Sequence, residues 1–163
     1  EEHMGLFNWL KKNPEIKKAE FVSPATGKII PIEQVEDETF ASKILGDGFA
    51  VELTDGEVIA PFDGEVTAAF PTGHAYGLKR EDGLECLIHI GLDTVELNGA
   101  GFDVKVKQGD QVKQGQLLVK VNLEQVTGAG KSLVSPIVFS SGASFTLLKN
   151  DSAVKGEEIL HLE

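Results

Sequence analysis

Two of the chain's four histidines, its only cysteine and a dense set of glycines are concentrated in one stretch, from Phe70 to Phe102. His74 and His89 are the side chains with the clearest chemical potential. A neutral imidazole has a free nitrogen lone pair, and with an unperturbed pKa near ~6.5 a useful fraction of it is neutral at physiological pH. This stretch is therefore the candidate functional site.

A β-hairpin is predicted to bring the two histidines together. The runs Thr72–Lys79 and Leu84–Ile90 have the composition of strands. Between them, Arg80–Gly83 has the polar residues and the final glycine of a tight turn. If the loop is even-numbered, His74 lies directly opposite His89, with Cβ atoms roughly 4.5 to 5.5 Å apart and both imidazoles on one face.

The loop length decides this arrangement. The even register also places Tyr76 opposite Leu87 and Leu78 opposite Glu85. A three-residue loop with a bulge at Gly83 would shift the register by one residue and send the two histidines to opposite faces, because side chains alternate along a strand. We predict the even register.

Length and composition favour one globular domain with its own core, since the chain has 163 residues and 41% hydrophobic content. One cysteine cannot form an internal disulfide, and no apolar run resembles a signal peptide or a membrane span, so a cytoplasmic protein is expected. The net charge of −11 argues against a nucleic-acid-binding surface and is compatible with a basic protein partner. A monomer is the default expectation.

The N-terminal residues 1–18 are expected to lie outside the folded domain, which is assigned to residues 19–163. Glu1 to His3 precede Met4 and are interpreted as an expression remnant. Gly5 to Lys18 combines apolar residues with four lysines. It is predicted to be either a flexible tail or linker or an amphipathic segment that makes peripheral contact with a membrane.

An all-β fold is predicted from residue 19 onward, because short strand-like runs alternate with glycine turns and no long helical period occurs. Only Thr39–Leu45 and Leu123–Val126 look helical, as single turns. Besides the two strands of the hairpin, the predicted strands are Glu20–Val22, Lys28–Ile32, Phe49–Leu53, Glu65–Phe70, Val104–Lys107, Gln116–Val121, Leu133–Ser140, Ser144–Leu148 and Ile159–Leu162.

Two internal echoes indicate a duplicated hairpin motif. Ser23–Ile29 recurs as Ala60–Val66 in the pattern small-Pro-x-x-Gly-charged-aliphatic, and Val112–Leu118 resembles Val154–Leu160. Two copies are too few for a solenoid. We therefore predict paired hairpins that close a single antiparallel, flattened β-barrel or sandwich.

Other candidate motifs are weaker. Gly128–Ser132 ends like a phosphate-binding loop but lacks the first glycine of that pattern and a following helix. Cys86 lies three residues from His89 and therefore faces the other side of the strand, as expected for a buried core cysteine.

A resemblance follows from the whole set of motifs. Thr72-x-His74-Ala75, Gly83-x-Glu85 and the run from His89 through Gly91, Asp93, Thr94 and Val95 to Phe102 resemble the glucose-type enzyme IIA family of the bacterial phosphoenolpyruvate-dependent sugar phosphotransferase system. Gly46–Ala50, Ala60-Pro61-x-x-Gly64 and Val112-Lys113-x-Gly115 also fit, so the resemblance runs from Phe21 to the C-terminus.

The resemblance implies a phosphotransferase with a phosphohistidine intermediate. His89 would accept a phosphoryl group from the histidine-containing phosphocarrier protein and pass it to the cysteine of a sugar-specific IIB domain of a IIB/IIC permease. His74 would stabilise the phosphoryl group, and the hydroxyl of Thr72 would join their hydrogen-bond network. Partners would dock on Phe40, Phe70 and Leu87, surrounded by Asp37, Asp93 and Glu96.

Two further hypotheses stay open beside the phosphoryl carrier. The unphosphorylated face could bind regulatory target proteins, or the histidines could belong to a zinc hydrolase. A catalytic zinc needs three protein ligands, and Asp93 is the only nearby acid with a claim. No cofactor or resident metal is expected, and a zinc ion on His74 and His89 would be adventitious or interfacial.

Overall fold

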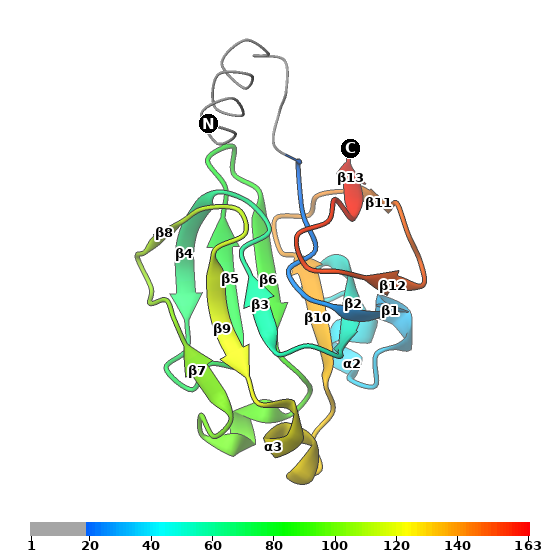
Figure 1. Cartoon of the computed structure of the whole chain (residues 1–163). Coiled ribbons are helices and arrows are strands. Elements are labelled where there is room, and N and C mark those ends of the chain that lie inside the picture. Colours follow the sequence, from blue (N-terminus) through cyan, green and yellow to red (C-terminus); the bar gives the residue numbers. More distant parts are fainter. Residues whose placement is uncertain (1–18) are drawn as a thin grey trace, which may run out of the picture.

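The described part of the chain, residues 19–163 of a computed structural model, forms three antiparallel sheets (Figure 1). Our interpretations of Glu1–His3 and of the segment from Gly5 to Lys18 lie outside the described residues. The largest sheet has eight strands in the order β12-β1-β2-β10-β6-β5-β4-β8, and the others are β3-β9-β7 and β11-β13. The strands are β1 Gly27–Pro31, β2 Asp47–Leu53, β3 Glu57–Ile59, β4 Gly64–Ala69, β5 Ala75–Lys79, β6 Glu85–His89, β7 Phe102–Val104, β8 Gln111–Val112, β9 Leu117–Val121, β10 Val134–Phe139, β11 Phe145–Leu147, β12 Ser152–Ala153 and β13 Leu160–Leu162.

The helical elements among the described residues are all short. They are η1 Ile32–Gln34, α2 Glu38–Ala41, η2 Thr94–Leu97 and α3 Leu123–Gly128. In residues 19–163 no helix is long and apolar enough to cross a membrane. The prediction of an all-β fold with single helical turns is confirmed.

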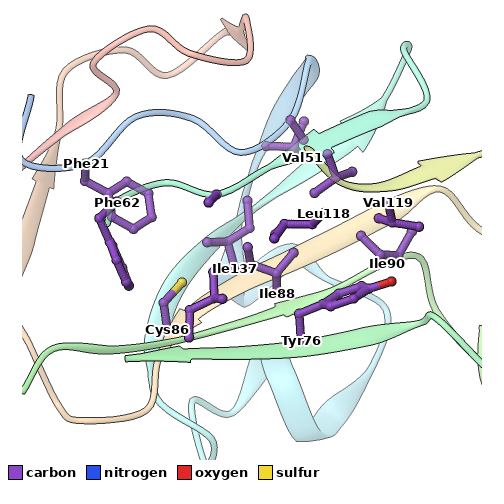
Figure 2. Close-up of a cluster of buried hydrophobic side chains, with 14 of the residues drawn as sticks. Phe21, Val51, Phe62, Tyr76, Cys86, Ile88, Ile90, Leu118, Val119 and Ile137 are labelled. Atoms are coloured by element: carbon purple, nitrogen blue, oxygen red, sulfur yellow. The ribbon is translucent and has the colours of Figure 1, made fainter. Parts of the chain in front are cut away.

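The main core lies between the small sheet and the large one. In Figure 1, β3 and β9 lie across β5 and β6. Figure 2 shows Leu118 and Val119 of β9 facing Tyr76, Cys86 and Ile88 of the large sheet, and all five side chains are buried. The sheets are open at their edges. Of the two predicted architectures, a flattened barrel and a sandwich, the structure is therefore the sandwich.

A second, smaller core lies on the opposite face of the large sheet. Phe40 of α2 packs there with Ile32 of η1, over Ala50 of β2 and Val138 of β10. Asp37 caps α2, because its Oδ1 accepts a hydrogen bond from the Thr39 N–H at 3.0 Å. This packing places α2 on the same face of the sheet as Leu87, which contacts the second core.

The duplicated motif is present as a set of reciprocal backbone hydrogen bonds. Val22 N–H donates to the Pro61 carbonyl at 3.1 Å, and the equivalent Ile59 N–H donates to the Pro24 carbonyl at 2.9 Å. The C-terminal echo behaves in the same way. The N–H groups of Gly156 and Gly115 donate to the carbonyls of Ser23 and Ala60, at 2.9 and 2.8 Å.

The predicted hairpin register is wrong by one residue. Lys79 pairs with Glu85, Tyr76 with Ile88 and Ala75 with His89. The loop has three residues, 81–83, because the Arg80 N–H donates to the Leu84 carbonyl at 2.8 Å and Gly83 takes a φ of 97°. Asp before Gly is compatible with both loop lengths, and the left-handed glycine that ends the type I turn selects the longer one.

Some predicted element bounds also differ. Glu20–Val22 forms no strand, and its one β-bridge is the isolated bridge between Val22 and Glu158. The strand predicted at Val104–Lys107 lies earlier, as β7, and the helix predicted at Thr39–Leu45 ends at Ala41. The short strands β3, β8 and β12 were not predicted, since two or three residues carry no readable alternation.

Candidate functional site

His89 lies at the end of β6, on the face of the large sheet opposite the main core. Its neighbours Ile88 and Ile90 point into that core, so alternation directs His89 outward, where it is partly exposed. Its Nδ1 atom lies 2.7 Å from the carbonyl oxygen of Gly91. A carbonyl oxygen can only accept, so Nδ1 carries the proton and the neutral ring has its lone pair on Nε2.

His74 lies just before the first residue of β5, in the turn that leads into that strand. Gly73, with a φ of 79°, directly precedes it, so its side chain need not follow the strand alternation. The His74 side chain reaches His89, and the ring centroids are 5.5 Å apart at an interplanar angle of 70°. The two histidines therefore meet, as predicted, although the register that was expected to bring them together is wrong.

Thr72 supports the ring of His74. Its Oγ1 lies 2.9 Å from His74 Nδ1. A hydroxyl can donate or accept, so either tautomer of His74 satisfies this contact. The His74 side chain is 5% exposed, which limits the positions it can adopt.

Two phenylalanines flank the histidine pair at its two ends. The Phe40 ring lies 5.2 Å from the His89 ring, and the Phe70 ring lies 5.0 Å from the His74 ring, both in edge-to-face geometry. Their exposures differ sharply, because Phe40 is 5% exposed and Phe70 is 48% exposed. Of these two predicted partner residues, only Phe70 offers a large apolar area to a partner.

Burial lowers the pKa of both imidazoles below the ordinary value of 6.5. For His74, the nearby His89 ring lowers the pKa further. For His89, the hydrogen bond to the Gly91 carbonyl and the charges of Asp37 and Asp93 oppose part of the shift. Both rings are therefore held in the neutral form at physiological pH.

The remaining predicted residues surround this pair. Asp93 directly precedes η2 and has a left-handed φ of 59°, and Glu96, within η2, pairs with Lys131. Leu87 lies two residues before His89 and on the same face of β6. The charges of Asp37 and Asp93 act on the His89 ring, whereas the Glu96 carboxylate is paired with Lys131.

The structure also shows which residues are absent from the site. Cys86 is 1% exposed and belongs to the main core, and burial raises the pKa of its thiol (Figure 2). Within residues 19–163, no group of three or more His, Cys, Asp and Glu side chains is arranged to hold a metal ion. The predicted ligand pair of His74 and His89 thus gains no third protein ligand from the described chain.

Two residues near the site were not singled out from the sequence. Val95 of η2, two residues after Asp93, is 52% exposed. Ser135, a buried serine of β10 that bonds to Gly91, gave no signal at all.

Comparison with known proteins identifies the family of the chain. Residues 19–145 match the family model of the phosphoenolpyruvate-dependent sugar phosphotransferase system, EIIA 1. The chain is 44% identical over 150 residues to the PTS system glucose-specific EIIA component of Staphylococcus aureus (strain COL), covering 90% of each protein. A relative with the same name from Staphylococcus epidermidis is 44% identical over 144 residues, covering 86% of this chain and 87% of that protein.

A solved structure has the same fold. The glucose permease IIA from Mycoplasma capricolum superposes with a TM-score of 0.80 at 40% identity, covering 90% of this chain and 96% of that one. The match thus extends over sequence, fold and nearly the whole folded region. The chain belongs to the EIIA 1 family of the phosphoenolpyruvate-dependent sugar phosphotransferase system.

Proposed function

We propose that this protein is a phosphoryl carrier in which Nε2 of His89 accepts a phosphoryl group from the histidine-containing phosphocarrier protein and passes it to the cysteine of a sugar-specific IIB domain. The observation that carries the proposal is the 2.7 Å hydrogen bond between His89 Nδ1 and the Gly91 carbonyl. This bond occupies one ring nitrogen as a donor and leaves the other as a lone-pair nucleophile.

The transfer needs no separate base. As the Nε2–phosphorus bond of His89 forms, the nitrogen–phosphorus bond of the donor phosphohistidine breaks, and the electron pair of that bond returns to the donor imidazole. In the second step a cysteine thiolate of the IIB domain attacks the same phosphorus, and the leaving electron pair returns to Nε2. Because phosphoryl transfer depends chiefly on in-line positioning and charge stabilisation, a fixed imidazole is sufficient.

His74 stabilises the phosphoryl group but is not itself phosphorylated. When the Thr72 hydroxyl donates to Nδ1 of His74, the proton of the neutral ring resides on Nε2, which can donate to a phosphoryl oxygen. The ring separation of 5.5 Å is compatible with a phosphoryl group on His89 lying against His74. The role of His74 is then to stabilise negative charge during transfer.

The partners would dock around the two rings. Phe70 at 48% exposure and Val95 at 52% exposure supply apolar contact area, and such exposed side chains commonly mark interaction surfaces. Asp37, Asp93 and Glu96 supply negative charge that suits a partner with a basic rim. The sugar would be of the glucose type, since the relatives from both staphylococci are named glucose-specific EIIA components.

The test is the intact mass of the protein after incubation with phosphoenolpyruvate, enzyme I and the histidine phosphocarrier. Wild type and His74→Gln should each gain one acid-labile phosphoryl group, and His89→Gln should gain none. His161→Gln is the matched control, because His161 is an exposed histidine that pairs with Glu20 near the C-terminus. It should behave as wild type.

The second half of the test adds a IIB domain. Phosphorylated wild type should transfer its group to the IIB cysteine, while phosphorylated His74→Gln should transfer it slowly. If wild type gains no phosphoryl group from phosphocarriers that are active on another acceptor, the carrier proposal is wrong. Equal loss of acceptance in the two site variants would refute the separate roles.

A further inference from the structure

The two peptide groups that flank Gly91 are each held by hydrogen bonds at both ends. In the group that joins residues 90 and 91, the Ile90 carbonyl accepts from Thr94 Oγ1 at 2.5 Å and the Gly91 N–H donates to Ser135 Oγ at 3.0 Å. In the next group, the Gly91 carbonyl accepts from His89 Nδ1, and the Leu92 N–H donates to the Ser132 carbonyl at 3.3 Å. The backbone segment that faces His89 is thus restrained by a hydrogen bond at each of these four backbone groups.

Ser135 connects this segment to the frame of the large sheet. It lies in β10, where it pairs with Val51 of β2, and its side chain is 1% exposed. Its hydroxyl accepts from the Gly91 N–H and donates to the Leu133 carbonyl at 3.0 Å. The Ser135 hydroxyl therefore acts both as an acceptor and as a donor. Its position is fixed by β10, which pairs with β2 on one side and β6 on the other.

Such a clamp is needed because Gly91 has no side chain to restrict it. Its φ is 72°, and a Cβ atom there would lie 2.5 Å from the Ser132 carbonyl oxygen, so no other residue fits without a shift. A glycine peptide can rotate more freely than any other. If the peptide that joins residues 90 and 91 rotated, the φ of Gly91 would change and the Gly91 carbonyl would turn away from Nδ1 of His89.

The direction of that carbonyl decides where the proton of His89 resides. With the carbonyl in place, the proton stays on Nδ1 and the lone pair on Nε2. Without it, the neutral ring can move the proton to Nε2, and that tautomer has no lone pair with which to attack phosphorus. As the ring gains charge on phosphorylation, the hydrogen bond to the carbonyl also becomes charge-assisted and stronger.

We propose that Ser135 is a positioning residue for phosphoryl transfer: by accepting from the Gly91 N–H it fixes the peptide that joins residues 90 and 91, and so limits the rotation about the φ of Gly91 that would turn the Gly91 carbonyl away from His89 Nδ1. That carbonyl holds His89 in the Nδ1-protonated tautomer. Ser135 does not touch the phosphoryl group. The proposal rests on the proposed function for its kinetic consequence, whereas its structural consequence, the tautomer of His89, can be measured without any phosphoryl transfer.

The test compares Ser135→Ala and Ser135→Thr in the 163-residue protein. Side-chain nitrogen NMR of ¹⁵N-labelled wild type should show His89 almost wholly as the Nδ1–H tautomer, and Ser135→Ala should show a mixture with the Nε2–H tautomer. The rate of phosphoryl acceptance at saturating phosphocarrier should fall about 3- to 10-fold, the size expected for one net hydrogen bond, with KM for the phosphocarrier unchanged. Ser135→Thr keeps the hydroxyl and should restore both.

Ser23→Ala is the matched control, since Ser23 is also a fully buried serine but bonds to the Ala25 carbonyl far from the site in sequence. It should change neither the tautomer nor the rate. If Ser135→Ala fails to fold, Ser135→Cys keeps the volume with a much weaker acceptor and should give the same changes. A wild-type tautomer in these variants would overturn the proposal, as would an equal loss of rate in Ser23→Ala. Failure of wild type to accept a phosphoryl group would instead refute the proposed function.

Discussion

The imidazole rings of His74 and His89 stand 5.5 Å apart although they do not occupy opposed positions in the β5–β6 hairpin. Ala75 is the residue opposite His89, and His74 reaches it from the turn before the strand. Each ring has one nitrogen fixed from behind, by Gly91 and by Thr72. The site thus consists of two rings held separately and facing one another.

The lowered pKa of His89 predicts how phosphoryl acceptance depends on pH. The neutral ring is the nucleophile, and its pKa lies below the ordinary value of 6.5 because partial burial disfavours the charged ring. The midpoint of the decline in acceptance with falling pH should therefore lie below pH 6.5. Single-turnover rates between about pH 5 and 8 check this. A midpoint above 6.5 that coincides with the NMR titration of His89 would contradict it.

The same shifts predict a loss of stability in mild acid. Since the pKa of each ring is lower in the folded state, the unfolded chain binds more protons once pH falls below the unfolded value of 6.5. The histidines' contribution is fully present above that pH and is lost as pH falls through the folded pKa values. Urea unfolding at two pH values should show a smaller drop for a His74→Gln, His89→Gln double variant than for wild type, and an equal drop would refute the linkage.

Alanine substitutions of Phe40 and Phe70 should have different effects, one on stability and the other on partner binding. Phe40 is 5% exposed in the second core, so Phe40→Ala should lower the free energy of unfolding by about 3–5 kcal/mol. Phe70 is 48% exposed, so Phe70→Ala should change it by less than about 1 kcal/mol but weaken binding of the phosphocarrier. Urea unfolding and calorimetric titration measure the two quantities. Unchanged binding in Phe70→Ala would remove this residue from the docking surface.

Thr72 should matter for the second transfer more than for the first. Thr72→Val keeps the side-chain shape but removes the hydroxyl that lies 2.9 Å from His74 Nδ1. His89 should still accept a phosphoryl group, while transfer to the IIB cysteine slows about 10-fold or less, as expected for one lost hydrogen bond. Rapid-quench kinetics of each half-reaction separate these steps. A defect confined to acceptance would reverse the assigned role.

Gly83 tests the loop that sets the hairpin register. Its φ is 97° and a Cβ atom there would meet nothing within 4 Å, so Gly83→Ala should cost about 1–2 kcal/mol from backbone strain alone. Gly83→Asn should cost less, because asparagine tolerates a positive φ. Gly128→Ala is the control, since Gly128 ends α3 in equally open space without a positive φ, and it should be neutral or mildly stabilising. Urea unfolding ranks the three variants.

The sequence carried enough information to predict the fold class and the histidine pair, because the apolar alternation from Leu84 to Ile90 marks a half-buried strand. It did not determine the register. Asp82–Gly83 suits two loop lengths, and only the backbone angle of Gly83 distinguishes them. The direction of the His74 side chain could not be predicted for a related reason. His74 follows a glycine with a left-handed φ, Gly73, so its side chain need not follow the strand alternation.

Other parts of the site carry no local signal. Phe40 was predicted to contact partners, yet its burial depends on tertiary packing of α2 and η1 over β2 and β10. In the sequence, Ser135 is only a polar residue within an apolar strand, and nothing in this pattern indicates a role at the site. Its bond to Gly91 joins residues 44 positions apart, and such a contact is fixed only when β10 pairs beside β6.

The reciprocal hydrogen bonds of the two proline turns have a consequence for how the chain holds together. Val22 bonds to Pro61 while Ile59 bonds to Pro24, so each copy supplies to the other the contact that it receives. This is the pattern of an isologous interface, in which two identical subunits meet across a twofold axis. The two copies therefore behave as the subunits of a dimer joined covalently. A chain cut between Leu53 and Glu57 would regain the fold only through association of its fragments.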